Sequence, residues 1–311
     1  MQLLIKGQWQ EVSDLERQKI FQGSPDSGFR HWIGETTPFP PEKDRYVLYV
    51  SYACPFAHRT LIARKLQELE TIIPIVEVDT VRGKEGWTFA KPDPFCHVTF
   101  LRDLYTKADP TFTGRVTVPV LWDQKQQTIV SNDSGDILRM FNHAFKALVP
   151  STYDFYPKAL QQDIDAMNDF IYGTINTGVY KAGFARKQDD YEKAAQELFN
   201  ALDTVEKRLS QNRYLLGDGL TESDIRLFTT LVRFDAVYYG HFKCNLRRLT
   251  DYPHLWDYAR DIFQINGVAD TVDFDIIKTH YYKSHLDINP TGIVPIGPAM
   301  DWQQPSQRFA S

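Results

Sequence analysis

The stretch RYVLYVSYACPF, residues 45–56, passes from a strand pattern into a helix pattern within a few positions. Its first half is a run of β-branched and aromatic residues, which is typical of a buried strand. Beyond it, Ile62 and Leu66 recur at helical spacing, and Pro55 suits a first helical position because its missing N–H would be unpaired there. The stretch therefore predicts a strand that leads directly into a helix, with Cys54 at the junction.

Later segments extend this strand and helix into a domain. The region from about 81 to 114 is rich in Gly, Asp, Lys and aromatic residues, and we predict a long insertion there. The order β-α-β, then β-β-α, is that of a thioredoxin-like domain, which we place at residues 39–149. The other predicted elements of this α/β domain are a strand at 71–80, a hairpin pair at 118–122 and 128–130, and a helix at 136–148.

The chain after the break at Pro150 is predicted to be helical. Leu198, Leu202 and Val205 belong to a strong amphipathic stripe, and the segment TESD at 221–224 resembles a helix capping box. The predicted fold class is therefore an α/β N-terminal domain followed by an all-α C-terminal domain. The remaining boundaries are an N-terminal extension at 1–38 that wraps around the first domain, a helical domain at 150–286 and an ordered, proline-rich tail at 287–311.

Charge and composition argue against several classes of partner. The 311 residues carry a net charge of -5, so neither a nucleic acid nor an anionic membrane surface is an expected partner. No apolar run approaches the roughly 20 residues that cross a bilayer, and the first residues lack a signal-peptide pattern, so we expect a cytoplasmic protein. His280 and His285 lack the spacing and neighbours of a metal site, so no metal is expected.

Cys54 is the residue with the clearest chemical potential. A cysteine at a helix start is favoured as a thiolate by the helix dipole and the free N–H groups, which makes it a nucleophile. Ala57 stands three residues later, so a C-x-x-C disulfide is impossible, and a redox cycle needs an external thiol such as glutathione. We interpret Cys96 and Cys244 as small buried hydrophobic residues.

Two further positions favour a peptide-like ligand. Pro119 opens a predicted strand after a long loop. Together with Cys54 and the domain pattern, this predicts a cis Val118–Pro119 bond, which would leave the preceding backbone groups free to pair with such a ligand. Asp133 and Ser134 stand at the start of the next predicted helix, where N–H groups and a hydroxyl would bind a carboxylate and Asp133 would accept an ammonium group. Taken alone, the second pattern is also that of an ordinary helix cap.

The segment SYACPFAHRT at 51–60 resembles the active-site segment of the glutathionyl-hydroquinone reductases, the Xi class of glutathione transferases. This resemblance spans nearly the whole chain and implies the glutathione transferase fold and a homodimer. The other segments that carry it are GWTF at 86–89, RVTVPVLW at 115–122, GVYKAGFA at 178–185, TESDIRLF at 221–228, HYY at 280–282 and INPTGIVP at 288–295.

The resemblance also implies a reaction and a set of site residues. Cys54 would attack the sulfur of a glutathione that is conjugated to a hydroquinone, release the hydroquinone and form a mixed disulfide, which a second glutathione would resolve. The implied glutathione-binding residues are Trp87 and Arg115 at the glycyl side, Val118 at the cysteinyl part, and Asp133 with Ser134 at the γ-glutamyl head. The implied quinol pocket contains Phe56, Tyr180 and Tyr281, of which the two tyrosines would assist the leaving group.

This chain departs from the family pattern at two of these positions, and two other functions stay open. The family usually has Trp where this chain has Phe56, and Glu where it has Asp133. Either change would affect affinity or substrate range without touching the sulfur chemistry. One alternative is an omega-like thiol transferase or dehydroascorbate reductase, and the other is a non-catalytic binding module with the same fold.

Overall fold

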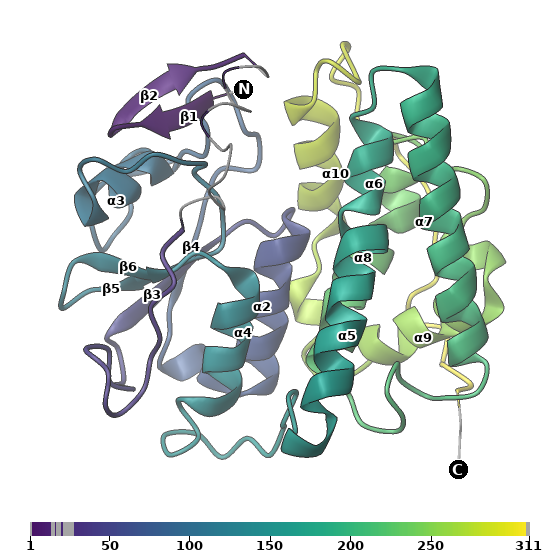
Figure 1. Ribbon diagram of the computed structural model, residues 1–311, viewed down its shortest axis with the longest axis horizontal. Helices are drawn as coiled ribbons and strands as arrows, with labels where there is room; N and C mark the ends of the chain where they lie inside the picture. Colours follow the sequence, from purple (N-terminus) through teal and green to yellow (C-terminus); the bar gives the residue numbers. More distant parts are fainter. Residues whose placement is uncertain (1, 14–15, 17–19, 21–27, 309–311) are drawn as a thin grey trace. The chain divides into compact units, whose positions relative to one another are not determined.

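The computed structural model describes residues 2–13, 16, 20 and 28–308 and divides the chain into two units (Figure 1). Unit 1 is Met1–Ser151, and unit 2 is Thr152–Ser311. Unit 1 combines a mixed sheet with helices, whereas the regular structure described in unit 2 is helical. The predicted fold class is therefore confirmed.

The sheet of unit 1 has the strand order β4-β3-β5-β6. Its centre is β3 (Tyr46–Val50), which pairs in parallel with β4 (Ile75–Glu77) and antiparallel with β5 (Val120–Asp123). β5 pairs antiparallel with β6 (Thr128–Ser131), as expected for the predicted hairpin. All of β3 is buried, because helices cover the sheet on both faces.

Three helices cover this sheet. α2 (Pro55–Leu66) and α4 (Ser134–His143) lie side by side on one face, and α3 (Leu101–Ala108) lies on the other (Figure 1). α2 begins directly after β3, as the sequence predicts, and Pro55 occupies its first turn. The carboxyl end of β3 therefore places Cys54 at the N-terminus of α2.

The structure corrects one prediction for the region between α2 and β5 and adds a helix to another. The strand predicted at 71–80 is only Ile75–Glu77, because residues 69–71 form a 3-10 turn and Pro74, which lacks an N–H, precedes the strand. The insertion predicted at 81–114 contains α3, whose buried Leu101, Leu104 and Tyr105 form a narrow amphipathic stripe.

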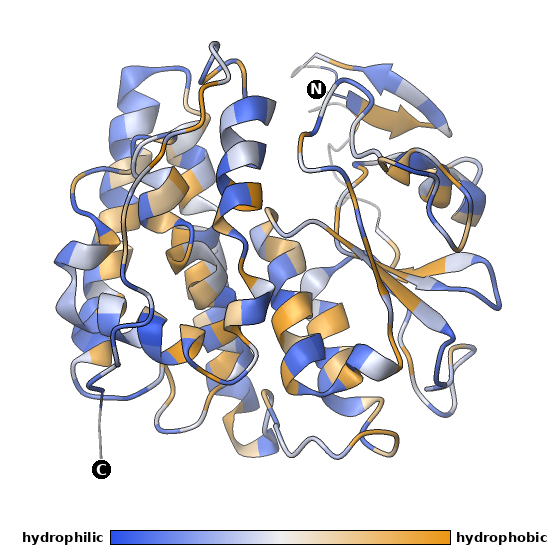
Figure 2. Cartoon of the chain, turned by 180° about the vertical axis from the view of Figure 1, so that it is seen from behind, coloured by the Kyte–Doolittle hydropathy of each residue, from blue (hydrophilic) through white to orange (hydrophobic). Residues whose placement is uncertain are grey.

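The N-terminal residues contain a hairpin that the sequence analysis missed. β1 (Gln2–Ile5) and β2 (Gln8–Glu11) pair antiparallel around Lys6 and Gly7, which both have positive φ, as a two-residue hairpin turn requires. Figure 2 shows that β1 is apolar and β2 polar. Part of the predicted extension, residues 1, 14–15, 17–19 and 21–27, lies outside the described residues.

Unit 2 is built around α8 (Glu222–Leu231), in which every residue except Arg226 is buried. The predicted capping box is present: the Thr221 side chain and the Asp224 side chain each pair with backbone at the helix start. Two π-helical turns, η3 (Tyr172–Asn176) and η4 (Phe234–Tyr238), interrupt the regular helices. The other α-helices are α5 (Gln161–Ile171), α6 (Gly178–Gly183), α7 (Gln188–Leu209), α9 (Pro253–Phe263) and α10 (Phe274–Ser284).

The tail after α10 contains no helix over its described residues 287–308 and contacts the helices of unit 2 along its length, including through Trp302 and Arg308. The ring of Trp302 packs against Trp256 and Phe263, with centroid distances of 4.8 and 5.1 Å. The guanidinium of Arg308 donates to the carbonyl of Leu209 at 2.6 Å and to that of Asn212. The tail thus pairs the last carbonyl group of α7, which the helix itself leaves unpaired, and a second carbonyl three residues beyond the helix.

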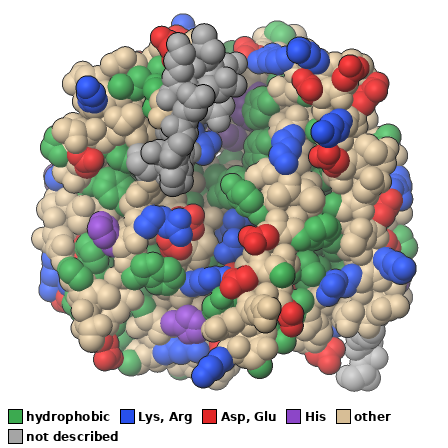
Figure 3. Space-filling view, viewed as in Figure 1, with side chains coloured by type: hydrophobic (Ala, Val, Ile, Leu, Met, Phe, Trp, Pro, Cys, Tyr) green, Lys and Arg blue, Asp and Glu red, His purple; other side chains and the backbone are tan. Residues whose placement is uncertain are grey.

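The molecular surface carries charges of both signs. Figure 3 shows lysine and arginine side chains interspersed with aspartate and glutamate over one face.

Among the described residues, no helix is both long enough and apolar enough to cross a membrane.

Candidate active site

Cys54 is the N-cap residue of α2 and has an extended backbone conformation. Its side chain is half-buried, and its Sγ lies 3.6 Å from the carbonyl oxygen of Val118 as a hydrogen-bond donor. The Cys54 carbonyl accepts the backbone N–H of His58 at 2.9 Å, so the helix begins at this residue. The thiol therefore lies at the positive end of the helix dipole, where a thiolate is stabilised.

The other two cysteines lie in environments that disfavour a thiolate. Burial raises the pKa of the Cys244 thiol to about 12. Burial also raises the pKa of Cys96, although the hydroxyl of Tyr49 at 3.8 Å partly opposes this effect. None of the three cysteines forms a disulfide, so the chain has one thiol at a helix start and two whose ionisation burial disfavours.

The Val118–Pro119 peptide bond is cis, as predicted. Within the described residues, the backbone N–H of Val118 has no hydrogen-bond partner, whereas its carbonyl oxygen accepts the Cys54 thiol. The adjoining backbone is held in place because the hydroxyl of Tyr105 donates to the Thr117 carbonyl at 2.8 Å. The two predicted residues Cys54 and Val118 are therefore in direct contact.

The N-terminus of α4 presents a second group of polar side chains. Asp133 is its N-cap and accepts the N–H groups of Gly135 and Asp136, both at 2.9 Å. Ser134 Oγ accepts a hydrogen bond at 3.3 Å from the buried guanidinium of Arg59, which extends from α2. Because of this contact, the helix that begins at Cys54 also fixes the Ser134 hydroxyl.

Arg30 adds a cation beside this helix start. Its guanidinium forms two hydrogen bonds with the Asp136 carboxylate, and these raise the pKa of Arg30. The nearest oxygen of Asp133 is 3.8 Å from Arg30 Nη1. One Asp133 oxygen is thus engaged in capping the helix, and the other faces a positive charge.

The remaining predicted residues of unit 1 lie on α2 and on two loops. The ring of Phe56 lies beneath the Arg59 guanidinium, 4.7 Å from its centroid. Trp87 is buried, and its carbonyl accepts the N–H of Leu101 at 3.0 Å. Arg115 is exposed. These three residues were predicted through the family resemblance alone.

In unit 2, the two predicted tyrosines form a hydrogen-bonded pair. The hydroxyls of Tyr180 on α6 and Tyr281 on α10 are 2.5 Å apart, and the hydroxyl of Tyr238 on η4 is 3.1 Å from that of Tyr281. A Cβ on Gly183 would come within 2.2 Å of the Phe242 ring, so glycine at this position lets Phe242 pack beside Tyr180. Burial raises the pKa of Tyr281 well above its ordinary value, so its phenol keeps its proton.

Comparisons with known proteins agree with this geometry. Family models for the N-terminal and C-terminal domains of glutathione S-transferase match residues 53–144 and 188–261. A glutathionyl-hydroquinone reductase of Escherichia coli K12 is 50% identical, and the match covers 98% of each chain. A second such reductase, from Sphingobium chlorophenolicum, is 44% identical over 96% of this chain and 97% of the relative.

Solved structures point to the same class. A Xi-class transferase from Natrialba magadii superimposes with a TM-score of 0.93 at 44% identity, covering 99% of this chain and 96% of that one. This chain belongs to the Xi class of glutathione transferases. The glutathione-bound structure of the Escherichia coli relative superimposes on this chain with a TM-score of 0.90 at 48% identity, and the match covers 99% of each chain.

The Xi-class assignment confirms the stated resemblance and identifies the chain as a glutathione-dependent enzyme. The alternative of a non-catalytic binding module is therefore set aside. Arg30 and Tyr238 were not predicted, because their contacts are with residues far away in the chain. No local pattern distinguishes Tyr238 from Tyr239 next to it.

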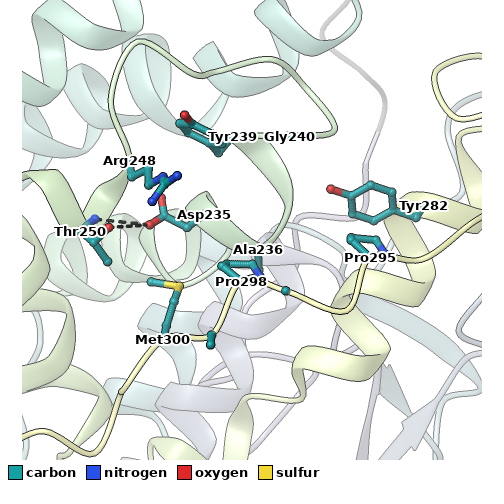
Figure 4. Close-up of a pocket in the computed structure, with 12 residues that line it drawn as sticks. Asp235, Ala236, Tyr239, Gly240, Arg248, Thr250, Tyr282, Pro295, Pro298 and Met300 are labelled. Carbon is teal, nitrogen blue, oxygen red and sulfur yellow. Dashed lines mark hydrogen bonds between the residues drawn. The ribbon is translucent and has the colours of Figure 1, made fainter.

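A pocket of ≈ 420 Å³ in this chain is lined by none of the predicted site residues (Figure 4). Tyr282, the neighbour of Tyr281, lines it and packs against His241 at a ring-centroid distance of 4.7 Å. Tyr281 thus belongs to the hydrogen-bonded group of tyrosines, whereas its neighbour Tyr282 lines the pocket. The remaining lining comes from Asp235, Ala236, Tyr239, Gly240, Arg248, Thr250, Pro295, Gly297, Pro298, Ala299 and Met300.

Proposed function

We propose that this enzyme reduces glutathionyl-hydroquinones to hydroquinones with glutathione as the co-substrate. The observation that carries the proposal is the single helix-start thiol of Cys54, with Ala57 in place of a resolving cysteine and Val118 in contact with the sulfur. A monothiol of this kind forms a disulfide with its substrate and needs a second thiol from solution to release it. The names of two reductases similar to this chain support the same reaction.

The proposed reaction has two balanced steps. In the first, the Cys54 thiolate attacks the glutathione sulfur of the conjugate, and the electron pair of the carbon–sulfur bond goes to the ring carbon, which takes up a proton. The products are the hydroquinone and a Cys54–glutathione disulfide. In the second, a glutathione thiolate attacks this disulfide, forms oxidised glutathione and regenerates the Cys54 thiolate. The net change is reduction of the conjugate at the expense of one glutathione.

We assign glutathione to the groups of unit 1 around Cys54. The Val118 backbone would pair with the cysteinyl part, because its free N–H and its carbonyl lie beside the thiol. The Ser134 hydroxyl and N-terminus of α4 would bind the γ-glutamyl carboxylate, and Asp133 would accept the ammonium group. Asp133 is one methylene shorter than the family's glutamate, so we expect a water-mediated contact. Trp87 and Arg115 would bind the glycyl end.

The tyrosine pair would assist departure of the hydroquinone, since a phenol donates a hydrogen bond to a ring oxygen. Changing Tyr281 to Phe is expected to lower kcat for a glutathionyl-hydroquinone by about 10²-fold, the usual range for loss of a proton-donating group. The raised pKa of Tyr281 keeps the donor protonated, so we expect no loss of activity from its ionisation as the pH rises to 9. Steady-state kinetics with Tyr282→Phe as the neighbouring control checks the effect. Equal losses in both variants would contradict the assignment.

The proposal is tested by turnover of two substrates under equal conditions. With excess glutathione, wild-type enzyme is expected to release free hydroquinone from glutathionyl-menadiol much faster than it reduces dehydroascorbate. The reverse preference would favour the omega-like thiol transferase, for which the same monothiol suffices. The product is measured by chromatography, so that loss of the conjugate and appearance of the hydroquinone are both followed.

A further inference from the structure

We infer that the N-terminal hairpin is a positioning device for the glycyl end of glutathione, and that Trp9 is its principal residue. The inference rests on the proposed assignment of Trp87 and Arg115 to that end. Trp9 lies on β2, and it contacts neither the thiol nor α4 in any hydrogen bond among the described residues. Its contacts instead hold the turn that leads to Trp87.

The turn at 83–86 is closed by a hydrogen bond from the N–H of Gly86 to the carbonyl of Gly83 at 3.1 Å. The indole N–H of Trp9 donates to the carbonyl of Lys84 at 3.1 Å. Gly86 has a φ of 79°, and a Cβ there would meet the Trp9 ring at 2.9 Å. The Trp9 ring therefore packs directly on the backbone of the residue that precedes Trp87.

Arg102 on α3 also binds the middle of the same turn. Its guanidinium donates to the carbonyl and the carboxylate of Glu85, both at 2.6 Å. The same guanidinium lies 4.0 Å from the centroid of the Phe100 ring and 5.2 Å from that of Trp9, both distances at which cation–π attraction is effective. The Arg102 side chain thus links α3 to both the 83–86 turn and the β1–β2 hairpin.

The other strand of the hairpin holds the segment before Arg115. Leu4 exchanges two backbone hydrogen bonds with Gly114, at 3.0 and 2.9 Å. The N–H of Lys6 donates to the Thr113 hydroxyl at 2.8 Å, and that of Gly7 donates to the Phe112 carbonyl at 2.9 Å. Because β1 pairs with this segment through backbone hydrogen bonds, it restricts the backbone conformation of Gly114.

Both proposed glycyl-binding residues therefore directly follow a residue that the hairpin holds. Trp87 follows Gly86, and Arg115 follows Gly114. The two segments lie far apart in sequence, and the hairpin bonds to both. Loosening it should weaken recognition of the glycyl residue while leaving the cysteinyl and γ-glutamyl contacts in place. Trp9 is thus a positioning residue for ligand selectivity.

The test compares two ligands by calorimetric titration of the whole enzyme. Glutathione contains the glycyl residue, and γ-glutamylcysteine lacks it. Wild type is expected to prefer glutathione. Trp9→Ala is expected to reduce that preference roughly three- to tenfold, the worth of about one hydrogen bond, with almost all of the change in the glutathione affinity. Trp9→Phe keeps a ring against Gly86 and should show a smaller reduction.

The control is Gln10→Ala, which alters an exposed neighbour on β2 and should leave the preference unchanged. Equal weakening of both ligands in Trp9→Phe and Trp9→Ala would overturn the inference, because it would indicate general damage to unit 1. An unchanged preference in both variants would overturn it as well. Titration does not depend on catalysis, so failure of the enzyme to reduce glutathionyl-hydroquinones would refute the proposed function without affecting this result.

Discussion

Replacing Cys54 with serine is expected to lower glutathionyl-hydroquinone turnover by at least about 10³-fold, because a serine hydroxyl at a helix start cannot form the mixed disulfide. The fold should persist, since serine is a favourable N-cap residue. The decisive measurement is release of hydroquinone by wild type and variant side by side. Comparable rates would show that the reaction does not pass through Cys54.

Selective alkylation provides an independent check on the same thiol. At neutral pH, iodoacetamide should label Cys54 well before Cys244, whose pKa of about 12 leaves almost no thiolate. Cys96 should also lag, because burial raises its pKa. Peptide mass spectrometry after timed labelling gives the three rates in one experiment. Cys96→Ser is the matched control, since it removes a thiol and should retain turnover.

Asp224→Ala is expected to lower the free energy of unfolding by about 3–5 kcal/mol, the largest effect on stability that we predict. The fully buried Asp224 carboxylate accepts the N–H groups of Leu215 and Thr221 and the hydroxyls of Thr221 and Tyr258, all between 2.8 and 2.9 Å. Alanine would leave these donors buried without an acceptor. Urea-induced unfolding followed by circular dichroism measures the loss.

Asp273→Ala is the matched control for this variant. Asp273 is the N-cap of α10 and accepts one N–H, that of Ile276, at 2.8 Å. Its removal should cost about 1 kcal/mol, the usual value for an N-cap. If both variants lose the same amount, Asp224 acts as a simple helix cap and its buried network adds nothing.

The parts of the fold that sequence predicted well are those set by neighbouring residues. The run of apolar residues in β3 followed by Cys54 and Pro55 determines a strand, a turn and a helix start without outside help. β1 is different, because four residues make no visible pattern, and the strand forms by pairing with β2 and Gly114. α3 was missed since its apolar stripe is only three residues wide.

The candidate site likewise contains features set by neighbouring residues and features set by distant ones. The position of Cys54 and the cap at Asp133 follow from local patterns, and the structure has both. The contact between Arg59 and Ser134 joins two helices, and that between Arg30 and Asp136 joins a loop to α4, so neither is encoded in any short segment. Long-range partners of this kind become visible only when the chain has folded.

The attachment of Arg308 to the end of α7 bears on the order of events during synthesis. A ribosome that adds about 5–20 residues per second completes the sheet of unit 1 and its covering helices once His143 has been made. The carbonyls of Leu209 and Asn212, by contrast, pair with the guanidinium of Arg308, which is translated several seconds later at that rate. Unit 1 can therefore fold while the ribosome is still translating unit 2, whose last helix-end contacts must form later.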